Sequence, residues 1–329
     1  MNIGEIAKMA GVSRAAVSRY FNKGYISEEK KEAIQRVVEA TGYRPSAQAQ
    51  TLRTKKTKMI GVVLPKITSE SIGGMVGGIS SVINESDYQM LLANTQNTPA
   101  RELEYLSIFN EKQVDGVIFI ATVFTKKHLE ALNHMKVPVV ILGQRLEGYN
   151  CYYHNDYQSE YEMTKMFLEK GRKKLGYIGV TLEDKAAGAA RYQGFCDALK
   201  EYGAEENADN FVIADFTMES GHEKAKELLE KNRNLDGILC ATDTIAVGAM
   251  LYLKEEKIKI PEEIAMAGNG NSALAKVTSP SLTTISHHYR DCGVLGARKM
   301  MDILENKDAE IAEVELDSSQ VWHDSFCGE

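Results

Sequence analysis

Hydrophobic positions follow two different spacings along the chain of 329 residues. Up to about residue 58 they recur every three or four residues, which is the spacing of an amphipathic helix. From Met59 onward, short runs that are almost entirely apolar, such as MIGVVLP and DGVIFIA, alternate with amphipathic stretches. Such strands between amphipathic helices are typical of parallel sheets with helices on both faces. The spacing therefore predicts a small helical head followed by an α/β body.

The head is predicted to contain three helices. The first has apolar residues at positions 3, 6, 7 and 10, and Gly11 ends it. Ser13 is suited to N-cap a second helix over about 14–22, and Ser27 is suited to N-cap a third that Gly42 ends. A helix, a short turn and a second helix form the helix-turn-helix arrangement, which places its second helix in the major groove of DNA. The alternative is a surface three-helix bundle.

The segment from Tyr43 to Lys58 interrupts this pattern. Pro45 suits the first turn of a short helix whose body is 46–53, and the basic sequence TKKTK follows it. A helix of this length is not stable alone in water. We therefore expect it to pair with DNA, with its own copy in a dimer, or with both.

The distribution of charge separates the two parts. The formal net charge is −7, which taken alone argues against nucleic acid. Residues 1–58, however, hold 12 Lys and Arg against 5 Asp and Glu, whereas the remainder holds 27 against 41. A head of charge +7 on a body of charge −14 indicates that the short module meets a polyanion.

The body contains about ten predicted strands in 270 residues, which favours two subdomains over one sheet. The expected fold class is thus an all-α helix-turn-helix head plus an α/β core of two doubly wound subdomains. The motif GGMVGG lacks the spacing of a dinucleotide fingerprint, so its glycines are expected to allow close helix packing.

Several other classes are disfavoured. The five cysteines are widely spaced without a C-x-x-C pair, so we expect reduced thiols and no metal site. No secretory signal is evident and no apolar run reaches the ~20 residues of a membrane span, so the cytoplasm is the expected location. Catalytic motifs such as Gly-x-Ser-x-Gly or a Walker A loop are absent, so neither an enzyme nor a cofactor is expected.

Ligands of doubly wound sheets bind beyond the carboxyl ends of the strands. The polar and aromatic residues that follow the predicted strands are Lys66, Gln144, Arg145, Arg191, Asp215, Phe216, Asp243 and Asn269. Three alternatives remain open: Asp243 as a helix N-cap, Arg191 as a structural ion-pair partner, and Phe216 as core packing.

The segments IGEIAKMAGVSRAAVSRYFN, SEEKKEAIQRVVEATGYRPSAQAQTLR and MIGVVLP resemble the lactose-repressor (LacI/GalR) family of transcription factors over essentially the whole chain. The resemblance implies base contacts from the second helix and a hinge helix that pairs in the minor groove. There Leu52 would be the wedge between base steps, and Ala49 the small residue at the helix pair. Gln50 departs from an arginine common in the family. The residues expected to face DNA are Ser13, Arg14, Ala15, Ser18, Arg19, Asn22, Ala49, Leu52 and Arg53.

The resemblance also implies a domain plan and a cleft like that of periplasmic sugar-binding proteins. The plan is a DNA-binding domain over 1–44, a hinge and linker over 45–58, and a core over 59–329. The first subdomain would comprise about 59–156 and 286–316, and the second about 157–285 and 317–329. The cleft positions implied by the family add His287, for which a solvated His287-His288 pair is the alternative. The expected effector-binding residues are Lys66, Gln144, Arg145, Arg191, Phe216, Asp243, Asn269 and His287.

The stretch ILCATDTIAVGAMLYLKEEKI followed by MAGNGNS looks closer to the trehalose-operon repressor type, whose effector is a sugar phosphate. The expected function is a homodimeric repressor of sugar-utilisation genes that binds a pseudo-palindromic double-stranded operator. A sugar or sugar phosphate would control its affinity for DNA. A sugar-binding protein without a DNA role and an α/β enzyme are the competing hypotheses.

Overall fold

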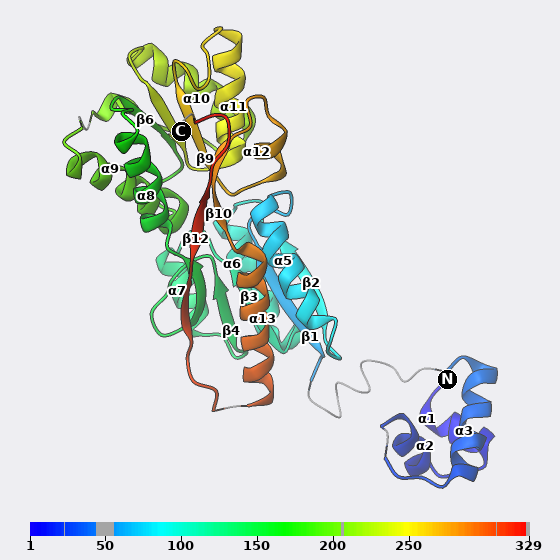
Figure 1. The fold of residues 1–329 in the computed structure, drawn as a ribbon. Helices are drawn as coiled ribbons and strands as arrows, with labels where there is room; N and C mark the ends of the chain where they lie inside the picture. Colours follow the sequence, from blue (N-terminus) through cyan, green and yellow to red (C-terminus); the bar gives the residue numbers. More distant parts are fainter. Residues whose placement is uncertain (23, 44–55, 205–206, 307, 327–329) are drawn as a thin grey trace. The chain divides into compact units, whose positions relative to one another are not determined.

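The computed structural model describes residues 1–22, 24–43, 56–204, 207–306 and 308–326, without the side chains of 112 and 113. The chain divides into two compact units, residues 1–57 and residues 58–329. Figure 1 labels the helices and strands of both units.

The first unit contains three helices in its described part: α1 (Ile3–Ala10), α2 (Arg14–Phe21) and α3 (Glu28–Thr41). Gly11 adopts φ 64° at the end of α1, and Ser13 Oγ accepts a hydrogen bond from Ala16 N at 3.2 Å to cap α2. Both predicted signals are thereby confirmed. Ser27 occupies the N-cap position of α3, but its side chain makes no capping hydrogen bond. The helices pack around a small core whose buried members are Ile6, Ala7, Ala16, Val17 and Ile34.

The second unit contains two six-stranded sheets. The first has the order β11-β5-β4-β3-β1-β2 and is parallel throughout. Its strands are β1 (Met59–Leu64), β2 (Gln89–Asn94), β3 (Gly116–Ile120), β4 (Val139–Leu142), β5 (Asn150–His154) and β11 (Glu313–Leu316). The order 2-1-3-4-5 places a switch point between β1 and β3, where a doubly wound sheet binds ligands.

The second sheet repeats this plan with the order β12-β10-β9-β8-β6-β7. Its strands are β6 (Leu175–Gly179), β7 (Phe211–Ile213), β8 (Gly237–Cys240), β9 (Ala265–Asn269), β10 (Thr283–His287) and β12 (Ser318–Val321). The edge strand β12 pairs antiparallel with β10, which differs from the expected all-parallel sheet. Two doubly wound sheets in one unit confirm the predicted fold class of the core.

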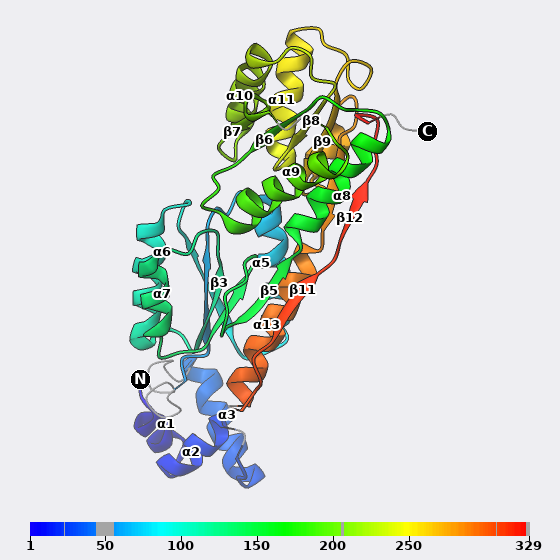
Figure 2. The same ribbon diagram turned by 90° about the vertical axis from the view of Figure 1, so that its left-hand side faces the viewer.

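Helices cover both faces of each sheet (Figure 2). Around the first sheet, α5 (Glu70–Ile83) and α13 (Tyr289–Glu305) lie on one face, and α6 (Pro99–Ile108) and α7 (Lys126–Asn133) on the other. Around the second sheet lie α8, α9, α10, α11 and α12, with bounds Asp156–Glu169, Arg191–Glu201, Met218–Lys231, Asp243–Glu255 and Ala273–Val277. Short helical segments complete the unit at Phe109–Gln113, Lys185–Ala190 and Ala208–Asn210. Because strand side chains alternate, Val62 packs under α5 and α13 whereas Val63 packs under α6.

Glycines allow α5 and α13 to approach closely, as predicted for the GGMVGG motif. A Cβ on Gly78 would lie 2.1 Å from the carbonyl oxygen of Arg290, and one on Gly293 would lie 2.0 Å from that of Met75. Both distances are far below van der Waals contact, so any side chain there would push the helices apart.

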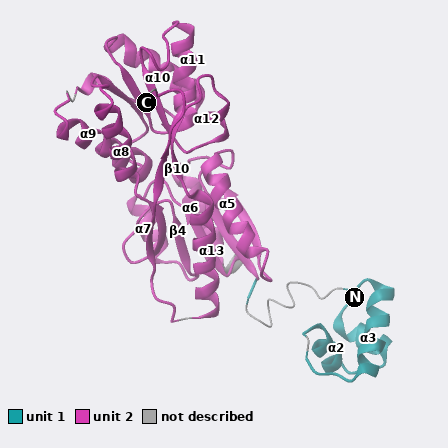
Figure 3. Ribbon diagram, in the orientation of Figure 1, with its two compact units in different colours: residues 1–57 teal, residues 58–329 magenta. Residues whose placement is uncertain are grey.

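The chain passes between the two sheets after β5, after β10 and after β11. Figure 3 shows the division of the chain into units, which falls between Thr57 and Lys58. Most of the segment predicted as hinge and linker lies outside the described residues. None of the helices in the described part is both long and apolar enough to cross a membrane.

Candidate functional site

The polar face of α2 is open to solvent in the first unit. Arg14, Ala15 and Arg19 are exposed, whereas Ala16 and Val17 on the opposite face are buried. This follows from the helical spacing, because three- and four-residue steps return to one face. The face therefore presents guanidinium groups outward.

The other predicted DNA-facing residues divide into two groups. Ser13 and Asn22 are exposed at the two ends of α2, and Ser18 is half-buried between them. The side-chain amide of Asn22 donates a hydrogen bond to the backbone carbonyl of Ser18. Outside the described residues lie Ala49, Leu52 and Arg53.

The second unit contains a cavity of about 320 Å³, which both sheets line. That volume lies within the ~300–1,000 Å³ typical of small-molecule sites. Its walls include the segments that follow the carboxyl ends of β1, β3, β4, β5, β6, β7, β8 and β9. Six of the eight predicted effector residues line it: Lys66, Gln144, Arg191, Phe216, Asp243 and Asn269.

Asp243 is the first residue of α11 and does not cap it. The N-cap is Thr242, whose side chain accepts a hydrogen bond from Ile245 N, so the N-cap alternative for Asp243 is wrong. The carboxylate of Asp243 accepts hydrogen bonds from Ser272 N at 2.7 Å and from the Thr284 hydroxyl. Burial raises the pKa of Asp243 above its ordinary value. Asp243 therefore fixes the loop after β9 while its side chain faces the cavity.

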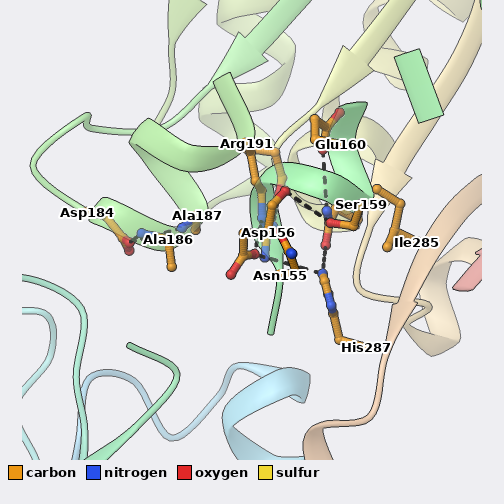
Figure 4. Close-up of polar contacts among 12 residues, drawn as sticks. Asn155, Asp156, Ser159, Glu160, Asp184, Ala186, Ala187, Arg191, Ile285 and His287 are labelled. Atoms are coloured by element: carbon orange, nitrogen blue, oxygen red, sulfur yellow. Dashed lines mark hydrogen bonds and ion pairs between the residues drawn. The ribbon is translucent and has the colours of Figure 1, made fainter. Parts of the chain in front are cut away.

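Arg191 lines the cavity and also makes a buried ion pair. Its NH2 and Nε lie 2.6 and 2.7 Å from Oδ1 of Asp156 (Figure 4). Its NH1 donates to the carbonyl of Ala241. Asp156 is the first residue of α8, directly after the chain has left the first sheet. The proposed alternative of a structural ion-pair partner is thus observed, together with the cavity position.

His287 lies outside the cavity lining but orients a residue that forms it. Its Nε2 lies 2.9 Å from Asn269 Oδ1, and Asn269 Nδ2 donates to Glu160 Oε2 at 3.4 Å. Because the carbonyl oxygen can only accept, Nε2 carries the proton. Burial raises the pKa of Glu160 to about 8. These two hydrogen bonds fix the orientation of the Asn269 amide. His287 is therefore buried in a hydrogen-bonded position and is not part of a solvated pair.

Gln144 and Arg145 are adjacent in sequence but separate in space. Gln144 Nε2 donates to Asp184 Oδ1 at 2.9 Å, which links the first subdomain to the second across the cavity. The side chain of Arg145 is 62% exposed, and its Nε lies 2.6 Å from Glu313 Oε1. Arg145 therefore does not reach the cavity.

Phe216 satisfies both of its proposed roles. Its half-buried ring packs against the core of the second subdomain and also lines the cavity. The ring therefore offers an apolar surface beside the carboxylates.

Further polar and aromatic residues, which the sequence did not point to, also line the cavity. Among them are Glu70, His154, Asp156, Asp184 and Tyr289. Glu70 accepts hydrogen bonds from Ala273 N at 3.0 Å, which is a second link across the cavity. Burial raises the pKa of Asp184 to about 6. Asp184 lies in the loop after β6. The rule that ligands bind beyond the carboxyl ends of the strands, the carboxyl-end rule, could therefore have found it. His154, in contrast, belongs to a strand that was not predicted.

Comparisons with known proteins agree with both units. Residues 2–46 match the family described as bacterial regulatory proteins, lacI family, and residues 164–326 match the periplasmic binding protein-like domain. The sucrose operon repressor of Staphylococcus xylosus is 31% identical over 309 residues, covering 94% of this chain and 95% of that protein.

Two solved structures share the fold. The lac repressor dimer bound to operator and the anti-inducer ONPF has a TM-score of 0.89 at 18% identity, covering 99% of this chain and 98% of that chain. The transcriptional regulator CelR–cellobiose complex has a TM-score of 0.76 at 23% identity, covering 99% of this chain and 100% of that chain.

Proposed function

Because this chain belongs to the LacI family of bacterial regulatory proteins, we propose that it represses sugar-utilisation genes under the control of a sugar-type effector. It is a DNA-binding transcription regulator and not an enzyme. The proposal places it in the bacterial cytoplasm, where operator DNA is found. The effector is a sugar or sugar phosphate in the cavity between the two sheets.

The cavity lining carries the effector half of the proposal. The carboxylates of Asp156, Asp184 and Asp243 and the amide of Asn269 line the cavity together with the half-buried ring of Phe216. Carboxylates and amides suit vicinal hydroxyls, and an aromatic ring suits the apolar face of a pyranose. The sugar name of the Staphylococcus xylosus relative agrees with this chemistry.

The exposed face of α2 carries the DNA half. Arg14, Ala15 and Arg19 would reach base edges, while Ser13, Ser18 and Asn22 would meet phosphates or neighbouring bases. A homodimer would present two such faces to a pseudo-palindrome, with half-sites about 10 base pairs apart or a multiple of that. Ala49, Leu52 and Arg53 would contribute the minor-groove contacts, with Leu52 as the wedge.

Effector and operator would be coupled through the angle between the subdomains. An effector shifts this equilibrium only by binding one arrangement more tightly than the other. The segments after β5, β10 and β11 connect the two sheets, so a change of angle must occur in them.

The test uses the full chain and DNA selected from a random duplex library. We expect the selected duplexes to contain a palindrome, and we expect anisotropy titrations at two salt concentrations to show weaker binding at higher salt. Sugars and sugar phosphates are then added to the complex. No palindrome in the selected pool, or affinity independent of salt, would overturn the operator half. A complex insensitive to every sugar and sugar phosphate would overturn the effector half.

A further inference from the structure

His154 is a residue of the cavity lining whose ring has an unpartnered nitrogen. It is the last residue of β5 and is only 6% exposed. Its Nε2 is buried and has no hydrogen-bond partner. Burying such a group without a partner costs free energy, so native proteins rarely leave one unsatisfied. An unsatisfied nitrogen on a residue that lines a cavity therefore points to a ligand.

The protonation state of His154 determines what its Nε2 can bind. Burial lowers the pKa of His154 to about 4, so the ring is neutral at pH 7 and carries one proton. Nε2 of a neutral ring either donates a hydrogen bond or accepts one. A hydroxyl group can do both, so it satisfies Nε2 in either tautomer.

The ring is held in place by its aromatic neighbours. Its centroid lies 4.9 Å from that of His287 and 5.2 Å from that of Tyr289. Both neighbours flank the segment after β10, where the chain leaves the second sheet. The direction of Nε2 is therefore fixed before a ligand arrives, which lowers the entropic cost of binding.

The charges around the cavity disfavour an anionic ligand. Four carboxylates line it, those of Glu70, Asp156, Asp184 and Asp243. The lining cations in the described residues are Lys66 and Arg191, and Arg191 is already paired with Asp156. A phosphate would meet Lys66 but also the unbalanced carboxylates, and it offers few protons to acceptors. Hydroxyl groups donate to carboxylates and to imidazole nitrogen alike.

We propose that the cavity takes an uncharged, hydroxyl-rich sugar, and that Nε2 of His154 makes a hydrogen bond with one of its hydroxyls. His154 thereby determines specificity for the sugar that carries a hydroxyl at this point. The inference rests on the proposed effector function of the cavity and narrows its ligand class to unphosphorylated sugars.

The first experiment measures ligand class with the full chain. Thermal shifts are recorded with matched pairs: glucose, sucrose and trehalose, each beside its 6-phosphate. We expect stabilisation by at least one neutral member and none by its phosphorylated partner. Stabilisation by the phosphates alone would overturn the inference and leave the proposed function intact. No stabilisation by any member would overturn both.

The second experiment tests His154 with the neutral sugar that binds. His154→Leu removes the hydrogen-bonding nitrogen, and we expect Kd to rise roughly 10- to 100-fold because a ligand hydroxyl loses its partner. His154→Gln offers a side-chain oxygen near the same point and should recover most of the affinity. The matched control is His323→Leu, because His323 also has an unpartnered Nε2 but does not line the cavity. Its Kd should equal that of the unaltered chain.

A cycle with deoxy sugars separates a direct contact from a structural effect. One deoxy analogue should bind the unaltered chain roughly tenfold more weakly than the parent sugar, yet bind His154→Leu as well as the parent does. A merely structural role would weaken all analogues by the same factor. Equal losses in both proteins for every analogue, or a His154→Leu Kd within twofold of the unaltered value, would overturn the contact.

Discussion

Replacing Glu160 by glutamine should reduce the fall in the free energy of unfolding of the core as the pH rises from 6 to 8. Glu160 is fully buried in α8, and its Oε2 accepts from Asn269 Nδ2 at 3.4 Å. Burial raises the pKa of its carboxyl from 4.5 to about 8, against the opposing effects of Arg191 and the Asn269 hydrogen bond. Glu160→Gln keeps the size of the neutral carboxyl and cannot ionise.

The direction and size of the effect follow from proton linkage. In the folded protein Glu160 holds its proton up to about pH 8, whereas in the unfolded chain it loses it near pH 4.5. Its contribution to stability is therefore complete below pH 4.5 and is lost as pH rises towards 8. With these two pKa values, the loss between pH 6 and pH 8 is about 2 kcal/mol. The free energy of unfolding of Glu160→Gln should not fall by this amount between pH 6 and pH 8.

Urea unfolding, followed by the fluorescence of Trp322, measures the effect in the second unit, residues 58–329. Trp322 is the single tryptophan of the chain, and the centroid of its ring lies 5.2 Å from that of Phe326. The ring of Phe326 lies 4.4 Å from that of Phe167 in α8. The free energy of unfolding is determined at pH 6, 7 and 8 for the unaltered chain and for Glu160→Gln. The control Glu223→Gln changes an exposed glutamate of α10 and should leave the pH dependence as it is. Parallel curves for Glu160→Gln and the unaltered chain would refute the burial argument.

Four further outcomes are expected. Arg19→Ala should lose about 1–3 kcal/mol of discrimination between operator and altered-base duplexes, measured by competition titration, and an unchanged profile would exclude base reading. Leu52→Ala should reduce operator bending in a gel-shift assay while effector binding persists, and unaltered bending would exclude the wedge. Asp243→Ala should bind operator but not respond to effector; a normal response would move the site elsewhere. Gly293→Ala should cost about 1–3 kcal/mol of stability, because its Cβ would lie 2.0 Å from a carbonyl oxygen. The control Gly73→Ala has open space around its Cβ and should stabilise the helix slightly. Equal melting temperatures for the two variants would contradict the packing argument.

The strands that the sequence predicted are those with continuous apolar runs. MIGVVLP and DGVIFIA became β1 and β3, central strands buried on both faces. Three strands were missed: β5, β11 and β12, with sequences NCYYH, EVEL and SSQV. Their residues are mixed or polar because β11 and β12 are edge strands and β5 lies beside one. Their pairing joins residues about 160 positions apart for β5 and β11, which local periodicity cannot report.

The candidate site was predictable to the extent that the carboxyl-end rule applies. The rule identified Gln144 and Asn269, which the structure brings to the cavity. It could not separate Gln144 from Arg145, because adjacent residues at a strand end point in different directions. It missed His154 because β5 itself was not predicted. A rule that depends on strand ends finds only the residues whose strands are found.

Two residues that line the cavity also lie at the connections between the two sheets. Asp156 begins α8 directly after the first passage, and Tyr289 begins α13 directly after the second. Protein groups also link the two subdomains directly, through Gln144 with Asp184 and through Glu70 with the backbone of Ala273. In the proposed coupling, these bonds would favour the observed arrangement whether or not a sugar is bound, so they would set the equilibrium on which a ligand acts. A sugar that contacts His154 and Asp243 together touches both subdomains. Only the difference between its affinities for two arrangements of the subdomains would then be transmitted to the DNA-binding unit.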